Sequence, residues 1–313
     1  MLFGPSGGER PVLTELAGCR TITCTQTILQ ALHLHTHYLR PDTLDQALAH
    51  LQAAGACPAA GCTDLFPATQ TRVLPGPVVD LTGIDELRGI TRTENGWRIG
   101  ATTTWSDIIR ADLPPAFHGL QLSAREVGAR QIQNRGTIAG NLCNASPAAD
   151  GLPPLLTLDA EVELSSVEGT RILPLSQFVL GPRKTALQVD EIVTAVHISN
   201  AAGQGRSHFL KLGARSYLVI SITMCAARIE IQDGVVQRAA LSIGACSPVA
   251  VRLKAVEQAL VGYPLDPDRI SEAAVSAALS PIEDVRADAG YRSDAAVEVL
   301  RRTVAELAAK EVA

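Results

Sequence analysis

A run of small and polar residues between positions 136 and 150 limits most strongly what this chain can fold into. It reads GTIAGNLCNASPAAD, with few large apolar side chains that could fill a core. We therefore predict a long loop here rather than a helix or a strand. Small residues let backbone N–H groups approach a ligand closely, and successive N–H groups in such turns form concave sites for anions.

A second run of the same kind lies upstream, between Ala59 and Leu65, where the sequence reads AAGCTDL. Hydroxyl and amide side chains add neutral hydrogen-bond donors to the two loops, at Thr63, Thr137, Asn141, Asn144 and Ser146. Neither loop has the lysine of a P-loop or the G-x-G-x-x-G pattern of a Rossmann dinucleotide site. The residues suit a pyrophosphate bound without a lysine, although each loop taken alone is more often an ordinary turn.

Composition excludes several classes of partner. The chain has 313 residues, a net charge of −5 and no cluster of lysine and arginine, so we expect no nucleic-acid binding. Its longest apolar runs are about ten residues, too short to cross a bilayer. The first residues, MLFGPSGGERPVLTEL, lack the basic and apolar segments of a secretory signal. We therefore predict a cytoplasmic location with no membrane span.

Cysteine and histidine spacing indicates no metal site. The seven cysteines are odd in number and irregularly spaced, which argues against a disulfide framework. Cys19 and Cys24 are spaced as in the first half of a plant-type iron–sulfur motif, but a threonine occupies the third position. His33, His35 and His37 alternate and would share one face of a strand. They could bind a metal, but no acid or thiol completes a site, so a solvent-facing or partner-facing strand is favoured.

The order of predicted elements places the chain in the α+β class. Residues 1–37 are interpreted as an N-terminal extension. Apolar residues at i, i+3, i+4 and i+7 predict a helix with Asp42 as its N-cap and its end at Gly55. Residues 118–133 are expected to be helical, and a β-hairpin is expected to close around Glu168-Gly169.

A hydrophilic linker, SNAAGQGRS, separates a C-terminal lobe that begins near residue 203. The segment 214–247 predicts three antiparallel strands, with a hairpin turn at Asp233-Gly234. Helices are expected from there to the C-terminus. Cys225 lies in an apolar strand and is expected in the core, and Asp284 and Arg286 are expected to form an ion pair.

Several stretches are similar to one known family, in the same order along the chain. Arg40-Pro41 before a helix and the loop from Ala60 to Leu65 resemble the family's R-P and A-G-G-T-D-L. The run at 133–150 resembles its R-N-x-G-T-I-G-G-N-L-x-N-A-S-P-A-A-D. Further likenesses are GPRKTAL at 181–187, FLKLGAR at 209–215 and SPIEDVRADAGYR at 280–292. The chain thus resembles the FAD-binding medium subunit of the xanthine dehydrogenase and carbon monoxide dehydrogenase family of molybdenum hydroxylases.

The resemblance, which covers about residues 38–305, implies a fold and a domain division. The fold is the vanillyl-alcohol-oxidase/p-cresol-methylhydroxylase-type FAD-binding fold of two α+β subdomains, plus a C-terminal lobe of antiparallel sheet and helices. The FAD-binding domain would span 38–200, with subdomains of about 38–92 and 93–200. A C-terminal domain similar to that of carbon monoxide dehydrogenase flavoproteins would span 203–313.

The resemblance also implies a set of FAD-binding residues. The two loops would bind the pyrophosphate, and Asp64 and Asp150 would contact ribose or ribityl hydroxyls. Leu187 would pack on the flavin ring, and Lys211 would lie near its polar edge. The complete set is Ala60, Gly61, Cys62, Thr63, Asp64, Leu65, Thr137, Ile138, Ala139, Gly140, Asn141, Asn144, Ser146, Asp150, Leu187 and Lys211. No catalytic side chain and no metal ligand are expected, because the flavin ring does the chemistry.

Some positions depart from the family pattern. Cys62 and Ala139 replace glycines, and a side chain there requires a negative φ or introduces strain. Both replacements are small, so FAD binding is expected to persist; a non-catalytic scaffold that has lost FAD is the alternative. Arg183 and Lys184 could steer an anionic electron acceptor or face a partner subunit. Apolar residues after Arg215, where many NAD-using relatives have acids, argue against NAD as the acceptor.

The function that the resemblance implies is electron transfer within a larger complex. This chain would carry FAD, while partner subunits carry molybdopterin and two [2Fe–2S] clusters. Electrons would pass from the clusters through FAD to NAD, a quinone or another acceptor, and the chain alone would not act on the hydroxylation substrate. The assembly would be a dimer of heterotrimers with an iron–sulfur small subunit and a molybdopterin-binding large subunit. A stand-alone flavin oxidoreductase of the same fold is the alternative.

Overall fold

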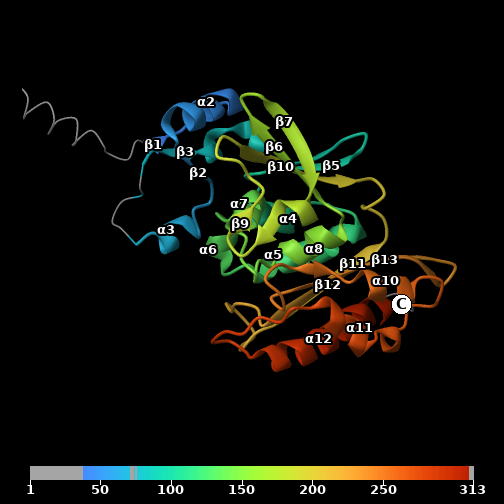
Figure 1. The fold of residues 1–313 in the computed structure, drawn as a ribbon. Helices are drawn as coiled ribbons and strands as arrows, with labels where there is room; N and C mark the ends of the chain where they lie inside the picture. The colour runs from blue at the N-terminus through green and yellow to red at the C-terminus, as the bar shows by residue number, and fades with distance from the viewer. Residues whose placement is uncertain (1–37, 71–73, 75, 310–313) are drawn as a thin grey trace, which may run out of the picture.

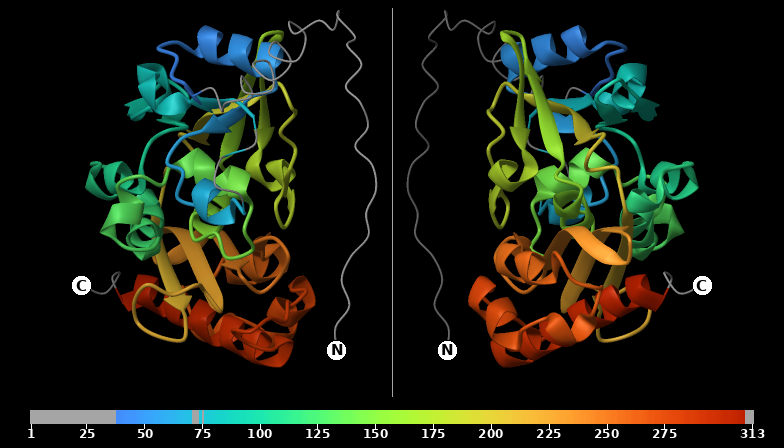
Figure 2. Two further views of the ribbon diagram at one scale, coloured as in Figure 1. Left: turned by 90° about the vertical axis from the view of Figure 1, so that its left-hand side faces the viewer. Right: turned by 90° about the vertical axis from the view of Figure 1, so that its right-hand side faces the viewer.

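The computed structural model describes residues 38–70, 74 and 76–309, which are arranged in three layers, each built around one sheet of three or more strands (Figures 1 and 2). A fourth, two-stranded sheet pairs β8 (Val179–Gly181) with β9 (Lys184–Thr185). The predicted N-terminal extension, with its cysteines and alternating histidines, lies outside the described residues. Within the part of the chain that is described, no helix is both long enough and apolar enough to cross a membrane.

The first layer is a small parallel sheet covered by one helix. Its strands pair in the order β1 (Tyr38–Leu39), β3 (Val78–Asp80) and β2 (Cys57–Ala59). The helix α2 (Leu44–Ala54) connects β1 to β2 along the chain. The predicted helix and its end at Gly55 are confirmed, with Gly55 in the left-handed conformation. Its N-cap is Thr43 rather than Asp42, because the Thr43 hydroxyl accepts the N–H of Gln46.

The second layer is a five-stranded antiparallel sheet. Its order is β4 (Ile90–Arg92), β5 (Gly96–Gly100), β10 (Ile192–Ser199), β6 (Glu161–Ser166) and β7 (Gly169–Pro174). The helices of this layer are α4 (Trp105–Arg110), α5 (His118–Glu126), α6 (Arg130–Gln133), α7 (Ile138–Asn144), α8 (Leu152–Thr157) and α9 (Leu175–Phe178). They share with the sheet one hydrophobic core that includes Trp105, Phe117, Ile138 and Phe178. The β6–β7 hairpin turns where predicted, around Glu168-Gly169.

Two predictions in this layer need correction. The expected helix at 118–133 is divided into α5 and α6, because Gly128 adopts a left-handed φ of 52°. The expected long loop after position 136 contains the seven-residue helix α7 and is followed by α8. Thr104 caps α4, with its hydroxyl accepting the N–H of Asp107.

The third layer is a four-stranded antiparallel sheet between two sets of helices. Its order is β11 (Arg206–Leu212), β12 (Thr223–Gln232), β13 (Val235–Gly244) and β14 (Val251–Arg252). One face packs against α12 (Ala289–Ala309), near α10 (Lys254–Leu260) and α11 (Glu272–Ala278), while α5 and α8 of the second layer contact the sheet as well (Figure 1). The Asp233-Gly234 turn and the buried Cys225 are confirmed.

The first strand of this sheet lies earlier than predicted. The sequence favoured a strand within the apolar run that follows Arg215, whereas the structure begins the sheet with β11 and leaves residues 213–222 outside any strand. Leu218 interrupts the run with a left-handed φ of 51°, and Tyr217 and Ile220 are exposed.

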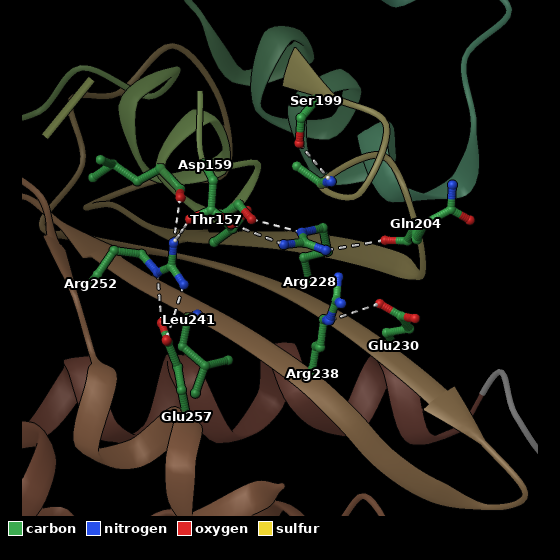
Figure 3. Close-up of polar contacts among 12 residues, drawn as sticks. Thr157, Asp159, Ser199, Gln204, Arg228, Glu230, Arg238, Leu241, Arg252 and Glu257 are labelled. Atoms are coloured by element: carbon green, nitrogen blue, oxygen red, sulfur yellow. Dashed lines mark hydrogen bonds and ion pairs between the residues drawn. The ribbon is translucent and has the colours of Figure 1, made fainter. Parts of the chain in front are cut away.

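An ionic cluster, in which Arg228 and Glu257 are buried and Asp159 is exposed, joins the third layer to the second (Figure 3). Arg252 donates to Asp159, at 2.6 Å, and to both carboxylate oxygens of Glu257, at 2.6 and 3.0 Å. Arg228 donates to the carbonyl oxygen of Thr157, at 2.7 Å, and to Asp159. The carboxyl end of α8 is thereby fixed against the C-terminal sheet.

Candidate functional site

The loop between β2 and the short helix α3 (Leu65–Ala68) presents unpaired backbone donors. Among the described residues, the N–H groups of Gly61, Cys62 and Thr63 donate to no other group of the chain. Cys62 has a left-handed φ of 59°, so the backbone reverses direction between neighbouring peptide groups. Successive N–H groups in such a turn form an anion-binding concavity.

This loop lies directly against the segment that leads into α7. A Cβ atom at Gly61 would lie 1.9 Å from the carbonyl oxygen of Arg135 and 2.9 Å from Cα of Gly136. The hydroxyl oxygen of Thr63 lies 3.5 Å from the corresponding position at Gly136. The two glycine-rich segments thus meet backbone to backbone, and only glycine fits at position 61.

Helix α7 forms because tertiary packing overrides the low helix propensity of its glycine and asparagine residues. The Thr137 hydroxyl accepts the N–H of Gly140, at 3.1 Å, while Ile138 and Leu142 are buried. The N–H of Ile138 donates to Thr103, and that of Ala139 to Ala101. The first N–H groups of this helix are therefore already satisfied, unlike those of the loop at 61–63.

A cavity of about 150 Å³ opens between these segments. Its walls are formed by β2 and the residue after it, by the connection between β5 and α4, by α7, and by β10 with the turn that precedes it. The lining residues are Pro58, Ala59, Ala60, Leu81, Ala101, Thr102, Ala139, Gly140, Cys143, Leu187, Glu191, Ile192 and Val193. Among them, Ala60, Ala139, Gly140 and Leu187 belong to the sequence-predicted set, so residues distant in sequence meet at one cavity.

Sequence reasoning missed several of these wall residues. Thr102 and Val193 gave no signal, because they sit in ordinary strand and turn patterns. Cys143 lies in the predicted second loop but outside the predicted binding set; its thiol lines the cavity, and burial raises the pKa of that thiol to about 12. Glu191 is a buried carboxylate at the cavity wall. The one sequence signal for its burial is its position directly before the apolar strand β10.

Asn141 carries a polar atom that the chain itself does not satisfy. Its Oδ1 atom is buried and has no hydrogen-bond partner among the described residues. It lies 3.0 Å from the position that a Cβ atom would take at Gly151. A buried acceptor without a partner is costly, which favours a ligand or a water as its missing donor.

Asp150 and Lys211 lie together in a second place, between the second and third layers. Lys211 Nζ is 2.8 Å from Asp150 Oδ2, and Ser221 donates to Asp150 Oδ1 at 2.7 Å. Burial raises the pKa of the Asp150 carboxyl, and the Lys211 ammonium and the Ser221 hydroxyl offset part of that rise. Lys211 also lines an open cavity of about 570 Å³, together with Arg125 and Arg215.

The other predicted residues line neither of these two cavities. Asp64 is exposed and begins α3 without a side-chain cap, and Leu65 is the first residue of that helix. Asn144, at the end of α7, accepts from the guanidinium of Arg183. Ser146 accepts the N–H of Ala148, at 3.3 Å.

Other predicted features are resolved by the same structure. Arg286 pairs with Asp284 at 2.6 Å, as predicted, and the buried Arg292 pairs with the same carboxylate at 2.7 Å. No group of histidine, cysteine and acidic residues suited to a metal ion occurs within the described ranges. Ala139 lies inside α7, whereas the left-handed Cys62 carries the strain that its departure from glycine implies.

A cavity beside a loop of unpaired backbone N–H groups, on a two-layer α+β unit with a separate antiparallel lobe, fits a nucleotide-cofactor-binding protein outside the Rossmann class. Two family models match the chain: the FAD binding domain in molybdopterin dehydrogenase, at residues 32–200, and the CO dehydrogenase flavoprotein C-terminal domain, at 208–307. The chain therefore belongs to the FAD-binding subunits of the molybdenum hydroxylases of the xanthine and carbon monoxide dehydrogenase type, a family of oxidoreductases. The predicted family and the predicted α+β fold are thus confirmed.

Individual relatives agree with this assignment. The chain is 36% identical to the nicotinate dehydrogenase FAD-subunit of Eubacterium barkeri over 73% of this chain and 80% of that one. It is 34% identical to the xanthine dehydrogenase FAD-binding subunit of Escherichia coli O157:H7, over 60% of this chain and 66% of that subunit. Among solved structures, the carbon monoxide dehydrogenase of Hydrogenophaga pseudoflava matches with a TM-score of 0.80 and 28% identity, over 88% of this chain and 97% of its own.

Proposed function

We propose that this chain binds FAD at the predicted residues and relays electrons within a molybdenum hydroxylase. The observation that carries the proposal is the contact between the two glycine-rich segments, beside a cavity that Ala60, Ala139 and Gly140 line. Within the described ranges, three unpaired N–H groups follow directly after Ala60, at residues 61–63. Bound FAD would supply redox chemistry, accepting electrons from [2Fe–2S] clusters on a partner subunit and delivering them to an external acceptor.

The residues present fit this cofactor. The N–H groups at 61–63 would donate to the negatively charged pyrophosphate, and the Thr137 hydroxyl can donate as well. Asn141 Oδ1 needs a donor, which a hydroxyl or amino group of the cofactor would provide. Leu187 and the small residues Ala60 and Ala139 offer apolar walls.

The remaining predicted residues would act further along the cofactor. Asp64 is exposed beside the first loop and is free to accept from a sugar hydroxyl. Asp150 is already bonded on both oxygens, so its part would be to fix Lys211 near the polar edge of the ring. Gly140 would allow close approach, and Ile138, Asn144, Ser146 and Leu65 would hold the loops in shape.

The partners follow from what the proposed relay needs. An iron–sulfur small subunit and a molybdopterin-binding large subunit would complete a heterotrimer, and two heterotrimers would form the assembly. The chain by itself would not turn over the hydroxylation substrate. We propose a cytoplasmic complex and a division of the chain into 38–200 and 203–313. The electron acceptor would be NAD, a quinone or another oxidant, and the apolar residues after Arg215 count against NAD.

Copurification from the native source tests this function. The chain is expected to carry about one FAD, to copurify with a small iron–sulfur chain and a large molybdenum chain, and to have its flavin reduced when the complex meets its substrate. A chain that purifies alone and turns over a substrate unaided would instead support the stand-alone flavin oxidoreductase. A native complex without flavin would support a scaffold role.

A further inference from the structure

The turn that carries Leu187 is held by an ion pair that lies outside the predicted site. Arg171, on the edge strand β7, donates to both carboxylate oxygens of Glu191, at 2.5 and 2.8 Å. The Glu191 side chain is 6% exposed and lies at the wall of the cavity. This two-point geometry is the strongest arrangement available to an arginine and a carboxylate.

The same two side chains also hold the backbone on either side of Leu187. The guanidinium of Arg171 donates to the carbonyl oxygen of Ala186, at 2.9 Å. The carboxylate of Glu191 accepts the N–H of Gln188, at 2.8 Å. Leu187 is therefore bracketed by one bond at residue 186 and another at residue 188, while its own side chain lines the cavity.

Two longer hydrogen bonds also form in this turn: the N–H of Leu187 donates to the Thr185 hydroxyl at 3.4 Å, and the N–H of Glu191 donates to the carbonyl oxygen of Gln188 at 3.2 Å. Residues 186–191 belong to no helix or strand, and Gln188 and Val189 are exposed. The N–H of Ala186, on the N-terminal side of Leu187, donates to the carbonyl oxygen of Phe178 at 2.8 Å. The Arg171 guanidinium holds the pKa of Glu191 below its usual value, so the carboxylate stays charged and paired. Both Glu191 oxygens are occupied by the chain itself, which leaves it no evident bond to offer a ligand.

We propose that Arg171 and Glu191 are positioning residues that set Leu187 against the cofactor in this cavity. The inference rests on the proposed FAD site and deepens it. Loss of the pair would free the 186–191 turn, withdraw an apolar wall from the cavity, and let the cofactor leave faster.

The test is a set of variants of the full chain, loaded with FAD. Arg171→Gln and Leu187→Ala are each expected to raise the FAD dissociation rate constant about tenfold, the effect of losing one charge-assisted hydrogen bond or comparable contact. The double variant is expected to release FAD no faster than Leu187→Ala alone, because the pair acts through Leu187. The visible circular dichroism of the bound flavin should change in the same variants.

Arg98→Gln is the matched control, since Arg98 pairs with Glu163 at 3.1 Å in the same sheet but does not line the cavity. It is expected to lower Tm without changing FAD release. Arg171→Lys, which keeps the charge near Glu191, is expected to be intermediate and carries the test if Arg171→Gln does not fold.

The positioning role would be overturned if Arg171→Gln released FAD at the wild-type rate, or if Arg98→Gln accelerated FAD release equally. It would also be overturned if the effects of the two single substitutions on the release rate multiplied in the double variant. These outcomes are distinct from failure of the proposed function, which would show as no FAD binding by the unmodified chain.

Discussion

Replacing Gly61 by alanine is the sharpest single perturbation of the contact between the two loops. The new Cβ would lie 1.9 Å from the carbonyl oxygen of Arg135, whereas ordinary contact needs about 3.5 Å. The loops would therefore have to part by about 1.5 Å, and the oxygen in the way is backbone rather than a flexible side chain. Overpacking of this kind costs about 1–3 kcal/mol.

The loss is expected to fall on cofactor binding, because parting the loops also displaces the N–H groups at 61–63 from the anion they would share. We expect the Kd of the apoprotein for FAD to rise by about 10- to 100-fold, measured by fluorescence titration beside a thermal melt. Gly290→Ala is the control, since its nearest atom is Asp288 Oδ1 at 3.4 Å. If Gly61→Ala binds FAD as tightly as the wild type, the inferred loop contact is wrong.

Three other outcomes are expected. Arg252→Met removes the two-point partner of the buried Glu257, which then keeps, among the described residues, only the N–H of Leu241 and the exposed Lys254, and it also removes the Arg252 bond to Asp159. We expect the free energy of unfolding to fall by about 3 kcal/mol in denaturant titration; an unchanged free energy of unfolding would remove the interlayer role of the cluster. Glu163 accepts a hydrogen bond from His197, which together with other donors lowers the pKa of the Glu163 carboxyl to about 2. The stabilisation from this carboxylate is present above pH 4.5 and is lost as the pH falls toward 2. In denaturant titrations, Glu163→Gln should therefore be less stable than the wild type at neutral pH and equally stable near pH 2. Cys143→Phe should fill the 150 Å³ cavity and abolish FAD binding, whereas unchanged binding would place the cofactor elsewhere.

The sequence revealed the elements whose signals are local. The periodic helix ending at Gly55 and the hairpin at Asp233-Gly234 need only spacing and turn chemistry, and both are confirmed. The helix α7 was not predicted, because glycine and asparagine disfavour helix and its stability comes from burial of Ile138 and Leu142. That i, i+4 pair and the N-capping Thr137 were its local signals.

Other features could not be read from sequence, because they depend on contacts between distant segments. Arg171 and Glu191 are 20 positions apart and carry no motif, yet they bracket a predicted site residue. The N–H groups of Ile138 and Ala139 donate to carbonyl oxygens in the connection between β5 and α4, and no pattern in the sequence indicates these bonds either. The resemblance indicates the class of ligand for the two loops, whereas only the structure identifies the backbone N–H groups that have no partner within the described part of the chain.

The most direct measurement is a titration of the purified apoprotein with FAD and, separately, with FMN and riboflavin. If the two loops bind the pyrophosphate, FAD should bind at about one equivalent and at least about 100-fold more tightly than either analogue, since only FAD presents that group. Equal affinity for the three flavins, or no binding of FAD, would contradict the account.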